Sequence, residues 1–193
     1  MKSLPLLSRL LVCAVIAAAA GLIATALPIV ITDRSLFAAM LIVSSATSAF
    51  KVTLPLPRSV STMSVSYAVD FACLLLLGAP QTMLIAAVSA WSQCTFRIRE
   101  PNPPYRTLFS MASLVVTVYA AGKAYSLLNG VPGDFDSWSK LTAVAGAATT
   151  YFLVNTALVA AAIALSTHTS ILKIWNENFL WSAPSYFVGA AAA

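Results

Sequence analysis

Long apolar stretches separated by short polar connections occupy most of this chain. Six have the composition of membrane helices and a seventh stops short; they lie near residues 10–32, 35–50, 64–79, 81–96, 107–128, 141–165 and 179–193. An α-helix rises about 1.5 Å per residue, so about 20 apolar residues cross a hydrocarbon core of roughly 30 Å. The pattern predicts an all-α fold. We expect a polytopic transmembrane helical bundle with six complete membrane segments and a truncated seventh, forming a single integral membrane domain over residues 1–193.

The third and fourth stretches are shorter than a spanning helix usually is. Gly78, Ala79 and Pro80 join them, and this sequence is typical of a tight helix stop and restart. The pair is either two short spanning helices or a re-entrant hairpin packed inside protein, where non-helical backbone is tolerated. Both arrangements place residues 51–62 and 97–106 on the same side of the membrane.

Basic residues are concentrated in every second connection. The basic connections carry Lys2, Arg9, Lys51, Arg58, Arg97, Arg99, Arg106 and Lys173. The alternate connections carry Asp33 with Arg34, and then Asp134 and Asp136 with Lys140. Because Lys and Arg are retained in cytoplasmic loops, this alternation predicts that the N-terminus is cytoplasmic.

Composition restricts the class of protein. At 60% hydrophobic and 9% charged residues, the chain lies far below the roughly 25% charged residues of soluble domains, which indicates an integral membrane protein. The net charge of +5 comes from basic residues that stand singly or in pairs beside apolar segments, which favours lipid-headgroup contacts over nucleic-acid binding. Cys13, Cys73 and Cys94 lie inside apolar stretches, and we expect inert buried thiols rather than a disulfide framework.

The first apolar stretch contains a sequence similar to a signal-peptide cleavage site, and the last is shorter than a complete membrane crossing. The first passes through Ala24-Thr25-Ala26, which imitates a signal-peptide cleavage site, but its apolar character continues to Ile31. A retained helix is therefore favoured over a cleaved one. The last stretch is too short to complete a crossing, and a terminal carboxylate inside hydrocarbon is costly. We expect a longer protein in which an eighth crossing follows.

Ionisable and amide side chains inside the apolar stretches form the candidate site. Asp70 is expected to face protein, water or a partner rather than lipid, because a carboxylate at mid-membrane costs several kcal/mol. It is either a ligand contact, a proton-responsive switch or an ion site, or else a structural carboxyl that joins helices. Lys123 is a candidate partner for Asp70, although its place near the end of a stretch favours snorkelling to the interface. Asn155 and Tyr67 complete the set, and interhelical hydrogen bonding is favoured over ligand binding for Asn155.

Several short motifs resemble one group of bacterial signalling proteins. They are Leu-Pro-Leu-Pro at 54–57 with the serine-rich 59–66, the leucine run and Gly-Ala-Pro at 74–80, Tyr-Phe-Leu-Val-Asn-Thr at 151–156, and Glu-Asn-Phe-Leu-Trp-Ser-Ala-Pro-Ser-Tyr-Phe at 177–187. From residue 51 onward the chain looks like the N-terminal membrane region of proteins with a cytoplasmic HD-GYP phosphodiesterase or GGDEF diguanylate cyclase acting on cyclic di-GMP. The resemblance implies a sensory region in the bacterial cytoplasmic (inner) membrane, with the catalytic domain outside this chain.

The chain's own chemical inventory does not supply a catalytic centre. His168 is the single histidine, whereas a two-metal hydrolytic centre needs several His and Asp ligands. The sequence has no Walker-type phosphate loop. We therefore expect no enzyme activity, no metal site and no cofactor within these residues.

Three functions remain open. The first is a sensory input module for a cyclic di-GMP enzyme. The second is a transport or substrate-capture subunit resembling the small S components of vitamin importers, with Asp70 and the 64–96 hairpin forming its site. The third is a purely structural membrane anchor. The expected partners are the lipid bilayer, an unidentified small ligand, a downstream cytoplasmic signalling domain and a second copy in a homodimer, with no nucleic acid.

Overall fold

The computed structural model describes residues 4–49, 51–53, 62–64, 66–96, 102–134, 140–179 and 183. The elements within them are α1 (Leu6–Ala26), α2 (Arg34–Ala49), β1 (Lys51–Thr53), β2 (Thr62–Ser64), α3 (Ser66–Leu77), α4 (Ala79–Thr95), α5 (Pro104–Leu127), α6 (Lys140–Thr167) and α7 (Ile171–Asn178). The predicted helical fold is confirmed. One small addition is an antiparallel ladder in which β1 pairs with β2, Lys51 opposite Ser64 and Thr53 opposite Thr62.

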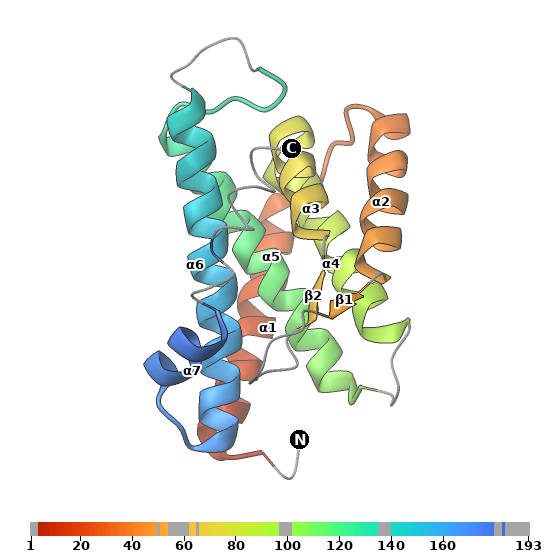
Figure 1. Ribbon diagram of the computed structural model, residues 1–193. Coiled ribbons are helices and arrows are strands. Elements are labelled where there is room, and N and C mark those ends of the chain that lie inside the picture. Colours follow the sequence, from red (N-terminus) through yellow and green to blue (C-terminus); the bar gives the residue numbers. More distant parts are fainter. Residues whose placement is uncertain are drawn as a thin grey trace.

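Helices α1 to α6 run alternately up and down the bundle (Figure 1). The starts of α1 and α5 lie toward one end, which we call the N-terminal end, and the shorter α3 starts nearer the middle and runs in the same direction; the turns that follow these three helices lie toward the opposite end. Basic Arg9 and Arg106 belong to the N-terminal end, and acidic Asp33 and Asp134 belong to the opposite end. Charge and helix direction therefore alternate together, as the sequence pattern requires.

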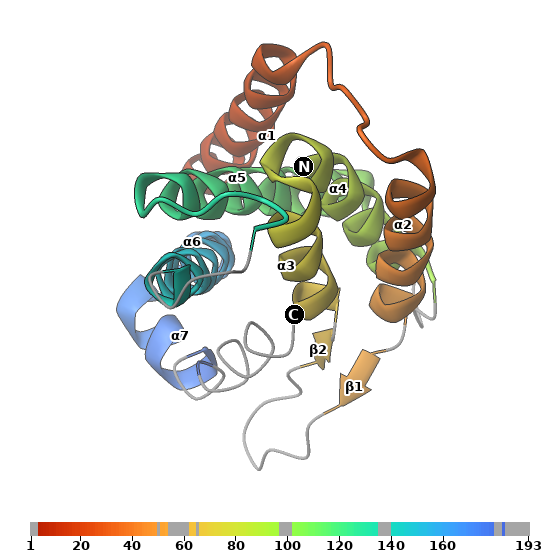
Figure 2. The same cartoon turned by 90° about the horizontal axis from the view of Figure 1, so that it is seen from above.

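Helix α5 occupies the middle of the bundle and packs against α4, α6 and α1. Helix α2 packs against α3 and α4 at one side, whereas α6 and α7 lie at another (Figure 2). The buried core where α1, α3, α4, α5 and α6 meet includes Val15, Phe71, Met83, Val118 and Tyr151. Non-local contacts with α5 thus connect helices that are far apart in the sequence.

The number of complete membrane segments was overestimated from the sequence. Among the described residues, three helices are long and apolar enough to cross a membrane: α1, α5 and residues Leu141–Thr167 of α6. Helix α3 has 12 residues, and at about 1.5 Å each they rise roughly 18 Å, well below a core of about 30 Å. Helices α2 and α4 have 16 and 17 residues, close to the predicted lengths. The overestimate therefore came from counting such short apolar stretches as complete crossings.

The segment after α6 differs from the expectation. The connection after residue 165 was expected to be irregular, but it contains α7, whose Ile171 and Leu172 are exposed. The truncated seventh segment, 179–193, lies outside the described residues apart from Phe179 and Ala183.

Helix α2 begins with a carboxylate cap. Asp33 Oδ1 accepts hydrogen bonds from Ser35 Oγ at 2.6 Å, from Ser35 N at 2.9 Å and from Leu36 N at 3.0 Å. These groups would otherwise lack partners in the first turn of a helix. The Ser35 hydroxyl, followed by the Leu36 amide, holds the pKa of the exposed Asp33 carboxyl below its usual value.

The predicted stop and restart between α3 and α4 is confirmed. Gly78 has a backbone φ of 79°. Residues with a Cβ atom rarely adopt such a positive φ, whereas glycine adopts it readily. Pro80 stands in the first turn of α4, where its missing N–H costs nothing. The turn is pressed against α5, because a Cβ built on Gly122 would lie 2.5 Å from the Cβ of Ala79. A residue without a side chain is therefore required where α4 and α5 meet.

Candidate functional site

A cavity of about 610 Å³ opens at the end of the bundle where α1, α3 and α5 finish. We call it the Lys123 cavity. Its lining comprises Leu22, Thr25, Ala26, Leu74, Leu77, Gly78, Ala79, Pro80, Met83, Tyr119, Gly122, Lys123, Tyr125, Ser126 and Pro132. Its size falls within the range of about 300–1,000 Å³ that is usual for small-molecule sites.

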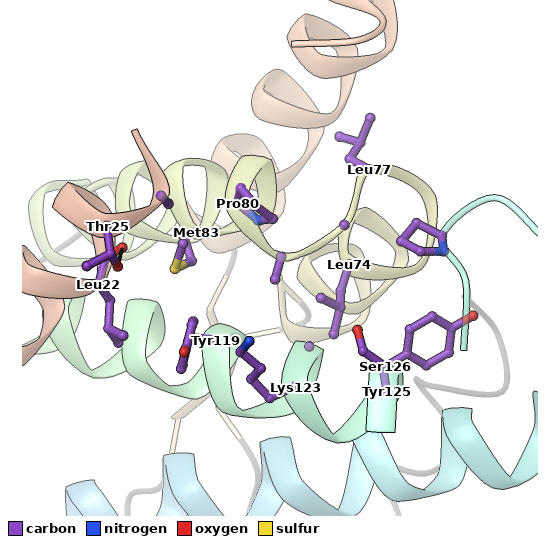
Figure 3. Close-up of a pocket in the computed structure, with 15 residues that line it drawn as sticks. Leu22, Thr25, Leu74, Leu77, Pro80, Met83, Tyr119, Lys123, Tyr125 and Ser126 are labelled. Carbon is purple, nitrogen blue, oxygen red and sulfur yellow. Dashed lines mark hydrogen bonds between the residues drawn. The ribbon is translucent and has the colours of Figure 1, made fainter. Parts of the chain in front are cut away.

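Most of the cavity wall is apolar, and its polar groups come mainly from α5. Figure 3 shows Tyr119 and Lys123 rising from α5, with Leu22 and Thr25 of α1 to one side and Met83 of α4 across the cavity. Lys123 Nζ lies over the Tyr119 ring, 5.5 Å from its centroid. This distance is within the range of a cation–π contact. Lys123 is the one charged side chain among the described lining residues.

A second polar feature joins α2 to α3. Ser44 Oγ of α2 donates a hydrogen bond of 2.6 Å to Asp70 Oδ1 of α3, and both side chains have no exposed surface. Asp70 Oδ2 is buried, and it has no hydrogen-bond partner among the residues that the structure describes. Burial of this carboxyl agrees with the expectation that it faces protein. Because interhelical hydrogen bonds hold membrane helices together, the pair fixes how α2 sits on α3.

Helix α2 is also joined to α4 through polar side chains. Ser92 Oγ of α4 donates to the Ser45 carbonyl at 2.9 Å. Gln81 Nε2 of α4 donates to Thr32 Oγ1, just before α2, at 3.2 Å. The contacts of α2 with its neighbours therefore include hydrogen bonds near both of its ends.

The four sequence-predicted residues do not form one site. Asp70 bonds Ser44 and Lys123 lies over a tyrosine, so Asp70 and Lys123 are not paired. Asn155 is half-buried on α6, and Tyr67 is half-buried in the first turn of α3, packed against the core. Lys123 belongs to the cavity, whereas Asp70 belongs to the interface of α2 with α3.

Sequence reasoning missed Ser44 and the cavity. Ser44 and Ser48 are both fully buried, and their spacing of four residues places them on one face of α2. That small polar pair in an apolar helix was the available signal for a buried hydroxyl face. The cavity had no comparable signal, because it depends on how α1 meets α4 and α5.

A further polar contact attaches α7 to α6. Trp175 Nε1 donates to Thr156 Oγ1 at 2.9 Å, and its ring lies 6.1 Å from the Phe152 ring. Thr156 is buried and donates in turn to the Phe152 carbonyl at 2.6 Å. Helix α7 therefore folds back along α6 instead of leaving it.

A smaller cavity of about 380 Å³ lies toward the N-terminal end of the bundle, between α1, α5 and α6. Its lining includes Ser8, Tyr105, Arg106, Phe109 and Ser166. No group of three or more His, Cys, Asp or Glu side chains among the described residues is placed to hold a metal ion. The expectation of buried thiols holds for Cys73 but not for Cys13, which is exposed.

The fold and its sites define a helical, membrane-associated protein with a ligand-sized cavity between its helices. Residues 31–191 match the MASE9 family, which is a family of membrane-associated sensory domains. The match covers every described helix after α1, and the chain belongs to this family. Comparison with curated proteins and comparison with solved structures gave no match. The resemblance to a membrane sensory region is thus confirmed, while the link to HD-GYP and GGDEF domains stays a prediction.

Proposed function

We propose that this chain is the multi-pass sensory input module of a bacterial signalling protein in the cytoplasmic membrane. The MASE9 match over residues 31–191 carries the proposal. In this role the bundle has two arrangements that a ligand binds unequally, since a ligand can shift an equilibrium only by its difference in affinity. The output domain lies outside these residues and is a cyclic di-GMP phosphodiesterase or cyclase. Motifs at 151–156 and 177–187 support that assignment.

In the proposed topology α1, α5 and α6 span the membrane, the shorter helices α2, α3 and α4 return the chain inside the bundle, and the N-terminus lies in the cytoplasm. The alternating helix directions support this, as does the basic character of the N-terminal end. Most residues of α3 are buried, and the helix packs against α2, α4 and α5. A helix too short to span is tolerated in such a position, because protein surrounds it.

Cysteine accessibility tests the topology. A thiol introduced at Asn129, which is exposed after α5, should react with an impermeant maleimide in intact cells from which the outer membrane has been removed. A thiol at Asn102, before α5, should react only after the inner membrane is permeabilised. Both variants need a background in which Cys13, Cys73 and Cys94 are replaced by alanine. Reaction in the opposite order would refute the orientation.

Cyclic di-GMP measurements test the signalling role, using the gene at its chromosomal locus. Removal of the gene should change the cellular concentration of cyclic di-GMP under at least one growth condition. Asp70→Leu, which breaks the bond to Ser44, should reproduce part of that change while the protein remains in the membrane. Asp70→Asn keeps a carbonyl oxygen for Ser44 and serves as the matched control. An unchanged concentration after gene removal would exclude a cyclic di-GMP output.

The Lys123 cavity also favours a second candidate, a substrate-capture subunit similar to an S component. Such a subunit would bind its substrate and deliver it across the membrane. Uptake of a bound compound by cells carrying the gene, together with unchanged cyclic di-GMP, would support this candidate over the sensory one. Binding without uptake would support sensing.

A further inference from the structure

The Lys123 cavity combines one cation with an apolar interior, and this combination restricts the chemistry of its occupant. Lys123 Nζ has an aromatic ring as its neighbour and no carboxylate partner among the described residues. Lys123 is an exposed residue that also lines the cavity, so its ammonium group is placed to pair with a negatively charged group that enters beside the apolar wall. The cavity therefore favours a ligand that brings one negative charge to this point.

The start of α4 adds positive potential from the backbone to the cavity. Gly78, Ala79 and Pro80 form the start of α4 and line the cavity. Helix α4 has 17 residues, and no side chain caps its first turn. A helix N-terminus carries partial positive charge and free N–H groups that attract anions. Since Gly122 presses against Ala79, the next residue, Lys123, lies beside this helix start.

The rest of the cavity suits a hydrocarbon chain. Leu74 and Met83 are almost completely buried, at 1% exposure each. Figure 3 shows Met83 and, farther away, Leu22 of α1 to one side of Lys123, and Leu74 to its other side. Burial of CH₂ groups against such a wall is favourable. Thr25 cannot offer its hydrogen to a ligand without losing a bond, because Thr25 Oγ1 donates to the Leu22 carbonyl at 2.9 Å.

We propose that the Lys123 cavity binds a single-chain amphiphile with an anionic head group, such as a medium-chain carboxylate. The head lies between Lys123 and the start of α4, and the tail lies along Leu22 and Met83. This inference deepens the proposed sensory function and names the class of molecule that would be sensed. The same chemistry is available from two sources, a free carboxylate or a membrane phospholipid. A cavity of about 610 Å³ favours the source with one tail.

Photo-crosslinking of the full chain in nanodiscs of neutral phosphatidylcholine tests the proposal. The probe is dodecanoate carrying a diazirine on its tail, and the matched neutral probe is the corresponding dodecanol. Labelled peptides are identified by mass spectrometry. We expect the carboxylate to label the C-terminal half of α1 and the first turns of α4, at least fivefold more than the alcohol does. Unlabelled dodecanoate should compete.

Four variants distinguish the effect of charge from the effect of cavity shape. Lys123→Met should lower carboxylate labelling at least fivefold, to the level of the alcohol, because a charge-assisted hydrogen bond is lost. Lys123→Arg should retain most of the carboxylate labelling, because it keeps the positive charge. Arg34→Met, which removes an exposed cation at the same end of the bundle but outside the cavity lining, should have no effect. Ala26→Phe adds bulk to the wall and should lower labelling by both probes.

Several results would overturn the proposal. Equal labelling by the carboxylate and the alcohol in the wild-type protein would show that binding does not depend on an anionic head group. Undiminished labelling of Lys123→Met would do the same. Competition by phosphatidylglycerol but not by dodecanoate would identify a two-tailed lipid as the occupant and refute the single-chain assignment. All these readouts measure binding alone, so the proposal can fail while the cyclic di-GMP output stands, and the reverse.

Discussion

The hydrogen bond between Ser44 and Asp70 should couple α2 to α3 energetically. Both side chains have no exposed surface, and the distance between Ser44 Oγ and Asp70 Oδ1 is 2.6 Å. Ser44→Ala removes the donor and leaves both carboxyl oxygens without a partner, since Oδ2 already has none. Interhelical hydrogen bonds in membrane proteins contribute about 0.6 kcal/mol on average and about 1.7 kcal/mol at most. We expect Ser44→Ala to lower the free energy of unfolding by about 1 kcal/mol, because the hydrogen bond is short and both side chains are fully buried.

Asp70→Leu should cost more, about 2–4 kcal/mol. It leaves the buried Ser44 hydroxyl unsatisfied, at about 1–3 kcal/mol, and forces a branched side chain into a packed interface, at about 1–3 kcal/mol. Asp70→Asn retains an acceptor for Ser44 and should cost less than about 1 kcal/mol.

Thermal unfolding of the purified protein in detergent, with a double-mutant cycle over Ser44→Ala and Asp70→Ala, provides the assay. A direct bond requires a coupling free energy of about 0.5–3 kcal/mol between the two positions. Thr47→Ala is the matched control on the same helix, because Thr47 Oγ1 bonds only to carbonyls of α2 itself, at Val43 and Ser44. Additive effects of Ser44→Ala and Asp70→Ala, with no coupling, would refute the reasoning. So would a control as damaging as Ser44→Ala.

Three other outcomes follow from contacts described above. Trp175→Phe loses the bond to Thr156 and should weaken the attachment of α7 by about 0.5–1.5 kcal/mol, seen as faster proteolysis between α6 and α7 with α1 to α6 intact. Gly122→Val should destabilise the bundle by about 1–3 kcal/mol through overpacking against Ala79, seen as a lower Tm, whereas a stable variant would contradict the close approach. Asp33 has a lowered pKa, so its stabilising effect is complete above the unfolded-state pKa and is lost as pH falls through the folded-state pKa; Asp33→Ala should flatten the acid limb of the Tm profile.

The helices were predictable from apolar runs where length and hydropathy agreed. For α5 and α6 a continuous apolar run also sets the helix length, so the predicted and observed ends agree within three residues. Helix α1 begins four residues before the predicted segment 10–32 and ends six residues before it does, at Ala26, although the apolar run continues to Ile31. Helix α3 was harder because β2 and Gly78 truncate it, and pairing of β2 with β1 depends on a non-local contact. Helix α7 was missed because its eight residues are too few to show a helical repeat of apolar positions. Its attachment also depends on a hydrogen bond from Trp175 to Thr156, which lies on another helix.

The candidate site was predictable one residue at a time but not as an arrangement. The cost of a carboxyl in hydrocarbon was enough to predict that Asp70 is buried. The identity of its partner required the register of α2 on α3, which no local pattern encodes. Lys123 was expected to reach toward the interface, which stays a prediction; its side chain is exposed, and it lines a cavity together with residues of α1, α3 and α4. Local chemistry identifies such residues, while tertiary packing decides which of them meet.

Helix α5 forms part of the wall of both cavities. Lys123 lies in the larger one and Arg106 in the smaller one, near opposite ends of the same uninterrupted helix. Its 24 residues make a rod about 36 Å long, and the hydrogen-bonded backbone leaves no joint along it. In a stiff rod, translation along the axis or rotation about it at one end is transmitted to the other end. The two ends of the bundle are therefore mechanically dependent, so a molecule that displaces α5 at one end also reshapes the cavity at the other.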